Sequence, residues 1–339
     1  MQSKVNFGLI GCGYWGPNFI RIIQNSRSAK LSRVCDTDAG RLSQFAERNE
    51  RVLFSENIED IINDDKIEAV IVCTPVQSHF EITKKLLLAG KHVLCEKPLA
   101  NTSAHCEELD RIANRAGKKL MVGHVFEYNA VVLHMKKLIA AHDIGDVLYM
   151  QFARMGLGPI RKDVNVVFDL ASHDVSIAAS LMGAQPISVI ANGACFVQPG
   201  IEDVAFIQLE FANQVFANIN VSWIDPIKQR IVKVVGSKKM LLFDDVSTTE
   251  KLKIIEAGKD YQVSSGDFGS FQLSTKDGEV IIPNLLHPEP LIEEFNHFVN
   301  CIKNKDMVPV TNAKHATSVV TTLEAIQSSI HNKGAKIAI

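Results

Sequence analysis

The sequence predicts two domains, an α/β domain on a doubly wound parallel sheet and an α+β domain on a large, open, mostly antiparallel sheet. Two observations predict this fold. Strands and helices alternate along residues 1–123, and long segments with a hydrophobic period of two follow in residues 124–339. The first pattern is typical of parallel sheets covered by helices, and the second is typical of antiparallel sheets with one buried face. A chain of 339 residues is also long enough for about two domains.

In the first domain, short apolar runs alternate with amphipathic segments. The predicted strands are 5–11, 31–36, 52–54, 68–74, 92–98 and 118–124. The predicted helices are 16–25, 38–49, a helical turn at 58–64, 78–90 and 105–117. The run 68–74 is almost wholly apolar, which is typical of a strand buried on both faces. Gly90 and Gly117 stand where two of the helices should stop.

The second domain begins with a predicted helix over 129–141 and a strand over 147–155. A helix that contains Asp169 and His173 follows. Strands 205–211 and 215–223 alternate apolar and polar residues and are separated only by Ala-Asn-Gln, so we expect a hairpin. The remaining predicted elements are strands 230–236 and 238–244, edge strands and loops within 251–282, and helices 289–302 and 315–330.

An open sheet of this kind should bury one face against a partner subunit. Apolar residues such as Ile219 and Val221 would otherwise lack cover. We therefore expect a homodimer or homotetramer.

Composition excludes several classes of function. The formal net charge is −2, which gives no reason to expect nucleic acid or an anionic membrane as a partner. Hydrophobic residues make up 46% and charged residues 22%, as in an ordinary globular protein with a core. No apolar run reaches the roughly 18 residues that indicate a transmembrane helix. The N-terminal residues lack the basic and apolar regions of a signal peptide, so we expect a cytoplasmic protein.

The seven cysteines form no Cys-x-x-Cys pair, and their number is odd. Cys12, Cys35, Cys73 and Cys95 lie at or near the ends of predicted strands. We expect them to be small buried side chains in a reducing compartment, without disulfides. No group of His, Cys or carboxylate residues has convincing metal-ligand spacing, so we expect no metal.

The segment Gly-Cys-Gly-Tyr-Trp-Gly contains the pattern G-x-G-x-x-G after a predicted strand and before a predicted helix. This context indicates a dinucleotide-binding Rossmann domain. Gly11 would permit a tight turn, Gly13 would let the backbone approach a pyrophosphate, and Gly16 would allow close packing of helix on strand. The N-terminus of the helix attracts the anion.

Asp36 ends the second strand, 20 residues after Gly16. A carboxylate there can accept hydrogen bonds from both ribose hydroxyls and would repel a 2′-phosphate, which favours NAD over NADP. Arg33 and Arg41 are close enough in sequence to affect this choice. The expected cofactor is NAD.

Glu96 and Lys97 follow a predicted parallel strand, and Cys73, Thr74 and Pro75 follow the preceding one. Ligands of open α/β sheets bind at the carboxyl ends of the strands. Two polar turns should therefore meet in one crevice, with Lys97 beside the cofactor ring.

Six motifs in order make the chain resemble the glucose–fructose oxidoreductase / inositol dehydrogenase (Gfo/Idh/MocA) family. They are GLIGCGYWGPN, CTPVQSH, CEKPLA, GHVFEYNA, DLASHD and EPLIEEFNHF. The resemblance implies that Lys97 lies beside the nicotinamide and the substrate hydroxyl, and that the Lys97–Pro98 peptide is cis. Ala130 replaces the usual proline of the fourth motif, which affects only the start of a helix. The motifs and the resemblance together assign the following residues to the cofactor: Gly11, Cys12, Gly13, Tyr14, Trp15, Gly16, Asp36, Thr37, Cys73, Thr74, Pro75, His79, Glu96 and Lys97.

Asp169 and His173 are four residues apart, which places them on one face of the predicted helix. The residues alone are equally consistent with a catalytic pair and with a structural role, in which an aspartate caps the helix and the histidine is part of the core. The resemblance implies a catalytic pair. His173 would take the hydroxyl proton as general base, Asp169 would orient the imidazole, and Lys97 would stabilise the alkoxide. Asp174 is expected to be structural.

The substrate is the least constrained part of this interpretation. The segments 161–174 and 222–241 resemble the branch that acts on nucleotide-linked sugars, similar to UDP-N-acetylglucosamine 3-dehydrogenases. Arg161, Lys228 and Arg230 could serve a diphosphate or be ordinary surface charges. The expected substrate residues are Lys97, Tyr128, Arg161, Asn165, Asp169 and His173. Alternatives are a dTDP-keto-sugar reductase, an inositol or free-sugar dehydrogenase, and a non-catalytic NAD-binding regulator.

Overall fold

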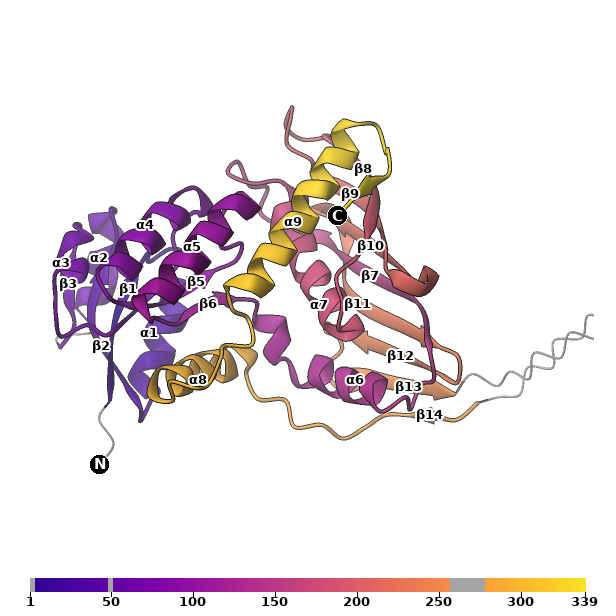
Figure 1. Ribbon diagram of the computed structural model, residues 1–339, viewed down its shortest axis with the longest axis horizontal. Coiled ribbons are helices and arrows are strands. Elements are labelled where there is room, and N and C mark those ends of the chain that lie inside the picture. Colours follow the sequence, from indigo (N-terminus) through magenta and orange to yellow (C-terminus); the bar gives the residue numbers. More distant parts are fainter. Residues whose placement is uncertain (1–3, 48–50, 257–277) are drawn as a thin grey trace, which may run out of the picture. The chain divides into compact units, whose positions relative to one another are not determined.

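Figure 1 shows the computed structural model of the protein, which describes residues 4–47, 51–256 and 278–339. The chain divides into two compact units. Unit 1 comprises Met1–Tyr128 and Pro288–Glu324, and unit 2 comprises Asn129–His287 and Ala325–Ile339. The predicted boundary at residue 124 lies near the first division. The predicted second domain, however, also included the segment Pro288–Glu324.

Unit 1 contains a parallel sheet of six strands in the order β3-β2-β1-β4-β5-β6, the doubly wound arrangement that the sequence predicts. The strands are β1 (Val5–Ile10), β2 (Ala29–Cys35), β3 (Leu53–Ser55), β4 (Ala69–Val72), β5 (His92–Glu96) and β6 (Leu120–Gly123). The helices of Met1–Tyr128 are α1 (Gly16–Asn25), α2 (Ala39–Ala46), α3 (Glu59–Ile62), α4 (Val76–Leu88), α5 (Ser103–Ala116) and the 3-10 helix η1 (Val125–Tyr128). Every residue of β4 is buried, as expected of a central apolar strand. Helix α5 ends at Gly117, which has a left-handed φ of 63°.

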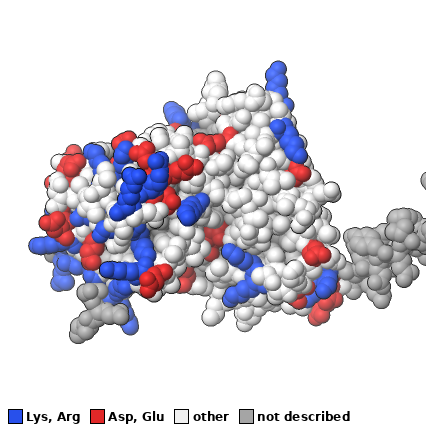
Figure 2. Space-filling view, viewed as in Figure 1, with Lys and Arg blue, Asp and Glu red and all other residues white. Residues whose placement is uncertain are grey.

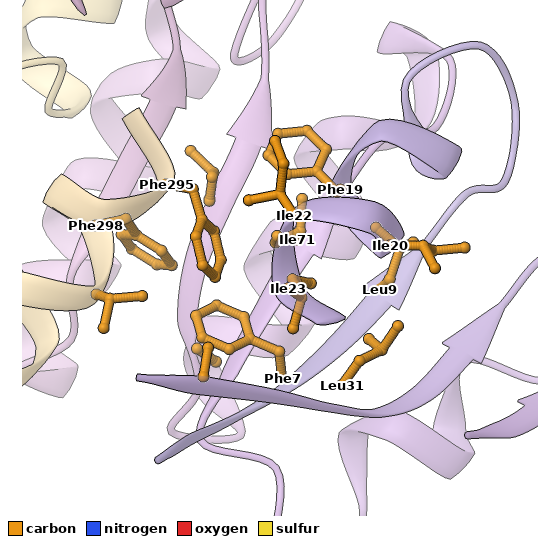
Figure 3. Packing of buried hydrophobic residues seen from close by; sticks show 14 of the residues in the cluster. Phe7, Leu9, Phe19, Ile20, Ile22, Ile23, Leu31, Ile71, Phe295 and Phe298 are labelled. Atoms are coloured by element: carbon orange, nitrogen blue, oxygen red, sulfur yellow. The ribbon is translucent and has the colours of Figure 1, made fainter. Parts of the chain in front are cut away.

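Helix α8 (Pro290–Lys303) packs against the sheet of unit 1, although its sequence position suggests the second domain. Phe295 lies 5.2 Å from Phe7 of β1 and Phe298 lies 6.1 Å from it, between ring centroids. Figure 3 shows both rings pointing toward Phe7, in a cluster with side chains of α1. All three rings are buried. The hydrophobic core of unit 1 is therefore completed by residues from near the end of the chain.

Unit 2 contains a sheet of nine strands in the order β14-β13-β12-β11-β7-β10-β9-β8-β15. The strands are β7 (Val147–Leu157), β8 (Ser188–Ala194), β9 (Val204–Glu210), β10 (Phe216–Ser222), β11 (Ile224–Gly236), β12 (Lys239–Asp244), β13 (Leu252–Glu256), β14 (Val280–Ile281) and β15 (Ile337–Ala338). Only β7 and β10 pair in parallel, so the prediction of a mostly antiparallel sheet is confirmed. The helices are α6 (Ala130–Ala140), a π-helix η2 (Val167–Ala171), α7 (Ser172–Met182) and a 3-10 turn η3 (Ala212–Gln214). Helix α9 (Ala313–His331) contributes residues to both units. The sequence did not predict β8 and β15, and part of the weak region 251–282 lies outside the described residues.

The hairpin of β9 and β10 is confirmed, with Ile219 opposite Ile207 and Val221 opposite Ala205. Ile219 and Val221 are 0% and 1% exposed, so they already have cover within the chain. Our reason for expecting a partner subunit was therefore wrong. Side chains alternate between the two faces of the sheet along each strand. The face opposite to Ile219 and Val221 exposes three large apolar side chains of β7, β8 and β9, namely Tyr149, Ile190 and Phe206.

Candidate membrane-spanning helices and metal-ligand clusters are both absent from the described residues. None of their helices is both long and apolar enough to span a bilayer. None of their His, Cys, Asp and Glu side chains form a group of three that could hold a metal ion. All seven cysteines are described and free; Cys12, Cys35 and Cys95 are buried, as predicted, whereas Cys73 is only partly buried. On the face drawn in Figure 2, positive and negative side chains intermingle over unit 1.

Candidate active site

The glycine loop follows β1, where two of its glycines are required by packing. Gly11 has a φ of 98°, which disfavours other residues. A Cβ at Gly11 would also lie 2.7 Å from the carbonyl carbon and oxygen of Cys73. A Cβ at Gly16 would overlap the carbonyl oxygen of Gly11. The loop therefore folds tightly back onto the start of α1 and onto the turn after β4.

Gly13 differs from these two because a Cβ there would meet no protein atom within 4 Å. Internal packing therefore does not explain glycine at this position, whereas close approach of a ligand does. Trp15 at the N-cap of α1 makes no side-chain capping hydrogen bond, so the first amides of the helix have no cap from it. Tyr14 beside it is 87% exposed. This arrangement fits the pyrophosphate of a dinucleotide.

Asp36 follows β2 and is 8% exposed. Its Oδ2 accepts the N–H of Cys12 at 2.6 Å and its Oδ1 accepts the N–H of Asp38 at 2.9 Å. The carboxylate is thereby fixed beside the glycine loop and keeps lone pairs for ribose hydroxyls. Arg41 Nη1 lies 3.9 Å from Asp36, and Arg33 pairs instead with Asp60 at 3.7 Å. Thr37 is exposed next to Asp36.

Burial and the charge of Asp36 raise the pKa of the Cys12 thiol to about 12. A thiol with such a pKa is neutral and unreactive at physiological pH. Cys12 therefore acts as a small packing residue in the loop, as the sequence predicts.

The turns after β4 and β5 lie side by side, because these strands are neighbours in the sheet. Cys73 and Thr74 are partly buried and Pro75 is exposed. Lys97 is partly buried, and the Lys97–Pro98 peptide is cis, as the family resemblance implies. The structure therefore brings the glycine loop and the turn after β4 into contact, with the Lys97 turn next to them at one edge of the sheet.

A second carboxyl group lies near Glu96. The Glu96 side chain is 9% exposed, and Gly123 leaves room for it, since a Cβ there would lie 3.1 Å from Glu96 Oε2. Burial raises the pKa of Glu96 to about 7, against the lowering effect of Lys97, whose N–H donates to Oε2 at 3.2 Å. Glu294 of α8 is 0% exposed, and neither of its oxygens has a hydrogen-bond partner among the described residues. Burial, and secondarily the charge of Glu96, raises the pKa of Glu294 well above its usual range.

We expect Glu294→Gln to flatten the pH dependence of stability. A carboxyl group whose pKa is raised on folding binds its proton more tightly in the native state. Its stabilisation is therefore full below the unfolded pKa and is lost as pH rises through the folded pKa. The variant should match the wild type near pH 4, below the ordinary pKa of glutamate, and become increasingly more stable than the wild type as the pH rises into mildly alkaline buffer. Urea unfolding across this range measures the difference.

The matched control is Glu293→Gln on the same helix, where the side chain is exposed. It should leave the pH dependence unchanged. Equal slopes for Glu294→Gln and the wild type would contradict the assignment of a protonated, buried Glu294.

In unit 2, Asp169 lies in the π-helix η2, directly before α7. The sequence predicts a regular helix here, and the structure differs by this local widening, which is a frequent feature of functional sites. Asp169 Oδ1 accepts from Arg161 Nη1 at 3.1 Å, and Oδ2 accepts from Trp223 Nε1 at 3.1 Å. Both oxygens of Asp169 are thus held from two sides. His173, in the first turn of α7, is partly buried.

Asp174 is structural, as expected. It is 1% exposed and faces Arg154 of β7, which is 6% exposed. Arg154 Nε lies 3.1 Å from both carboxylate oxygens, and Nη2 lies 2.7 Å from Oδ1. The pair joins α7 to the sheet beneath the candidate site.

Four side chains with sequence-predicted roles at the site make polar contacts within the protein. Arg161 donates to both oxygens of Asp163, at 2.9 and 2.6 Å, in addition to Asp169, so its charge is already neutralised. Asn165 donates to Glu202 and Gln327 at 2.7 and 2.6 Å and accepts from Phe168 N–H, so its amide serves the fold.

Tyr128 is 7% exposed, and its hydroxyl lies 3.3 Å from Thr311 Oγ1. His79 is 2% exposed with both ring nitrogens at carbonyl oxygens, so direct contact with a cofactor is not supported.

Sequence reasoning did not find Trp223, Arg154 and Glu294 as parts of these sites. Trp223 and Arg154 contact Asp169 and Asp174 across 54 and 20 residues, and Glu294 lies far in sequence from Glu96, so no local spacing signals these residues. The sequence pattern indicated the helix that contains Glu294 only through the motif EPLIEEFNHF, without singling out Glu294 itself. Lys228 and Arg230 lie exposed on β11, and Arg230 is 3.8 Å from Asp245.

The fold of unit 1 and its glycine loop are those of a dinucleotide-binding protein. The family model described as "Oxidoreductase family, NAD-binding Rossmann fold" matches residues 5–124, and the "GFO/IDH/MocA C-terminal domain" matches residues 132–242. Together they cover more than half of the chain, which therefore belongs to the GFO/IDH/MocA oxidoreductase family. Its first unit is a NAD-binding Rossmann domain.

Relatives and solved structures agree with this assignment. The chain is 30% identical to inositol 2-dehydrogenase 2 of Saccharopolyspora erythraea over 224 residues, which span 64% of this chain and 66% of that protein. It is 23% identical to scyllo-inositol 2-dehydrogenase (NAD(+)) of Bacillus subtilis, over 97% of this chain and 95% of that one. The crystal structure of GenD2 from gentamicin A biosynthesis in complex with NAD has a TM-score of 0.84 at 22% identity, covering 100% of this chain and 97% of that one. This last likeness shows the fold.

Proposed function

We propose that the protein oxidises a secondary hydroxyl of an uncharged cyclic polyol or free sugar. The names of two relatives, both inositol dehydrogenases, support this class of substrate. Bound NAD would supply the acceptor for the hydride. The glycine loop, Asp36 and the turns after β4 and β5 are the residues that would hold it.

His173 and Lys97 carry the proposed chemistry. His173 accepts the proton of the substrate hydroxyl, because an imidazole is a base near neutral pH. Lys97 donates a hydrogen bond to the same oxygen and stabilises its developing negative charge. Asp169, fixed by Arg161 and Trp223, orients the imidazole and favours its protonated form.

The choice of an uncharged substrate depends on one observation, the hydrogen bonds that Arg161 makes to Asp163 and Asp169. Arg161 donates a hydrogen bond to Asp169 of the proposed catalytic pair, and two carboxylates already surround its guanidinium. Binding a diphosphate there would require breaking these charge-assisted hydrogen bonds. A hydroxyl-rich neutral ring needs no such exchange.

A nucleotide-linked sugar is the second candidate. Lys228 and Arg230 favour it, since both are exposed on β11 and could approach phosphate oxygens. A non-catalytic NAD-binding regulator is less favoured, because a binding module would need neither Lys97 nor His173.

The test is NADH formation from NAD with myo-inositol, scyllo-inositol and glucose beside UDP-N-acetylglucosamine and a dTDP-sugar. We expect the highest kcat/KM with one of the uncharged compounds, and Lys228→Met should leave that value unchanged. A UDP-sugar that is preferred, and whose KM rises in Lys228→Met, would reverse the order of the two candidates. Tight NADH binding without turnover of any compound in either direction would indicate the regulator.

We also propose that the protein is a homodimer or homotetramer joined through the exposed face of the nine-stranded sheet. Tyr149, Ile190 and Phe206 give this face three large apolar side chains, with 38%, 36% and 56% exposure. Light scattering should give a dimeric or tetrameric mass, and Phe206→Glu should lower it. A monomeric wild type would contradict the proposal.

A further inference from the structure

His79 lies near the start of α4 and connects two turns of the NAD-binding unit. Its Nδ1 is 2.8 Å from the carbonyl oxygen of Pro98, in the turn after β5. Its Nε2 is 2.7 Å from the carbonyl oxygen of Thr74, in the turn after β4. The side chain is 2% exposed. The imidazole therefore bridges the turn at the glycine loop and the turn that carries Lys97.

Both partners of His79 are carbonyl oxygens, which can only accept hydrogen bonds. A neutral imidazole has one N–H and one lone pair, so it could donate to only one of them. The other nitrogen would then present its lone pair to an oxygen lone pair at hydrogen-bond distance. Turning the ring over would replace both nitrogens by carbons and lose both contacts. Of the two forms, only the imidazolium can donate to both carbonyl oxygens.

Two effects oppose a cation at this position. Burial disfavours the charged form of histidine, and the N-terminus of a helix carries a partial positive charge. Two charge-assisted hydrogen bonds act in the other direction, each roughly twice as strong as a neutral one. Distances of 2.7 and 2.8 Å are typical of such bonds.

We infer that His79 is a positioning residue, an imidazolium that ties the turn after β4 to the Lys97–Pro98 peptide and so holds Lys97 in place. The inference rests on the proposed function only because that function makes the position of Lys97 important for turnover. It replaces the expectation that His79 contacts the cofactor, since both ring nitrogens are used inside the protein.

The protonation state is tested first, without any substrate. In protein labelled with ¹⁵N-histidine, the His79 ring signals are assigned by their loss in His79→Gln. Both nitrogens should have the shift of a protonated nitrogen at neutral pH. His92 is the internal reference, because its Nδ1 accepts the N–H of Lys119 at 2.9 Å and burial lowers its pKa to about 4. A His79 spectrum with one protonated and one bare nitrogen, like that of His92, would overturn the inference.

The positioning role is tested by His79→Phe, which keeps the ring shape and removes both hydrogen bonds. We expect kcat to fall by about 10²-fold, the loss that a misplacement of about 1 Å can cause. The Kd of NADH should rise by less than kcat falls, because the glycine loop and Asp36 would still hold the cofactor, and His79→Gln, which keeps one donor group, should retain more activity. His105→Gln, whose ring stacks on Phe80 at 4.0 Å between centroids, is the control and should behave as wild type.

The two proposals fail in different ways. Normal kcat in both His79 variants would overturn the positioning role. Absence of turnover in the wild type with every compound would remove the proposed function, while a doubly protonated His79 in the spectrum would still support the bridge.

Discussion

A His173→Asn variant is expected to lose about 10²–10⁴-fold in kcat, the usual contribution of a general base. Asparagine keeps a polar side chain of similar size but cannot take up a proton near neutral pH. Binding of NAD involves the glycine loop and strand ends of unit 1, so the Kd of NADH should be unchanged. Steady-state kinetics with the best substrate of the panel, together with NADH titration, measures both quantities.

The control for this variant is His142→Asn in the same unit. His142 is exposed and has a φ of 53°, a backbone conformation that asparagine tolerates well. It should retain wild-type turnover. If His173→Asn also retained it, His173 would be a core histidine and another group would have to act as the base.

The largest expected effect on stability comes from the buried ion pair of Arg154 and Asp174. Arg154→Met removes the cation and leaves Asp174 as a buried carboxylate without its bidentate partner. Removing one member of such a pair costs about 3–5 kcal/mol, because the remaining charge is neither hydrated nor compensated. Urea unfolding followed by circular dichroism measures this loss.

The double variant Arg154→Met/Asp174→Leu separates two contributions to the free energy of unfolding, that of the ion pair and that of an isolated buried charge. Apolar residues of similar volume can replace a buried pair with little net change, so the double variant should be more stable than Arg154→Met alone. A single variant that loses under about 1 kcal/mol would mean that water reaches Asp174.

Much of the fold could be predicted because its signals are local. The six strands of unit 1 are short apolar runs between glycines, prolines and amphipathic helices, and their order follows from the βαβα rhythm. The hairpin of β9 and β10 was predictable from two alternating runs with three residues between them. Strands β8 and β15 carry weaker patterns, and β15 has only two residues.

The glycine loop was predictable for the same reason. Gly16 must be small because it lies against the carbonyl oxygen of Gly11, five residues earlier, and Gly11 lies against the turn after β4, the neighbour of β1 in the sheet. The partners of Arg161 and Asn165 were not. Their hydrogen bonds reach Asp163, Asp169, Glu202 and Gln327, and whether a basic side chain is free or neutralised depends on folding, not on spacing. The π-helix at Asp169 could likewise not be predicted, because the sequence pattern was analysed with the 3.6 residues per turn of an α-helix.

The docking of α8 onto β1 has a consequence for how the protein is made. Phe295 and Phe298, which cover Phe7, follow it by 288 and 291 residues and are synthesised correspondingly later. Until then the apolar surface beside β1 is uncovered, a state in which nascent chains depend on chaperones. Closing so long a loop also slows folding. The NAD-binding unit is therefore completed only after the segment Pro288–Glu324, far downstream of its glycine loop, has been synthesised.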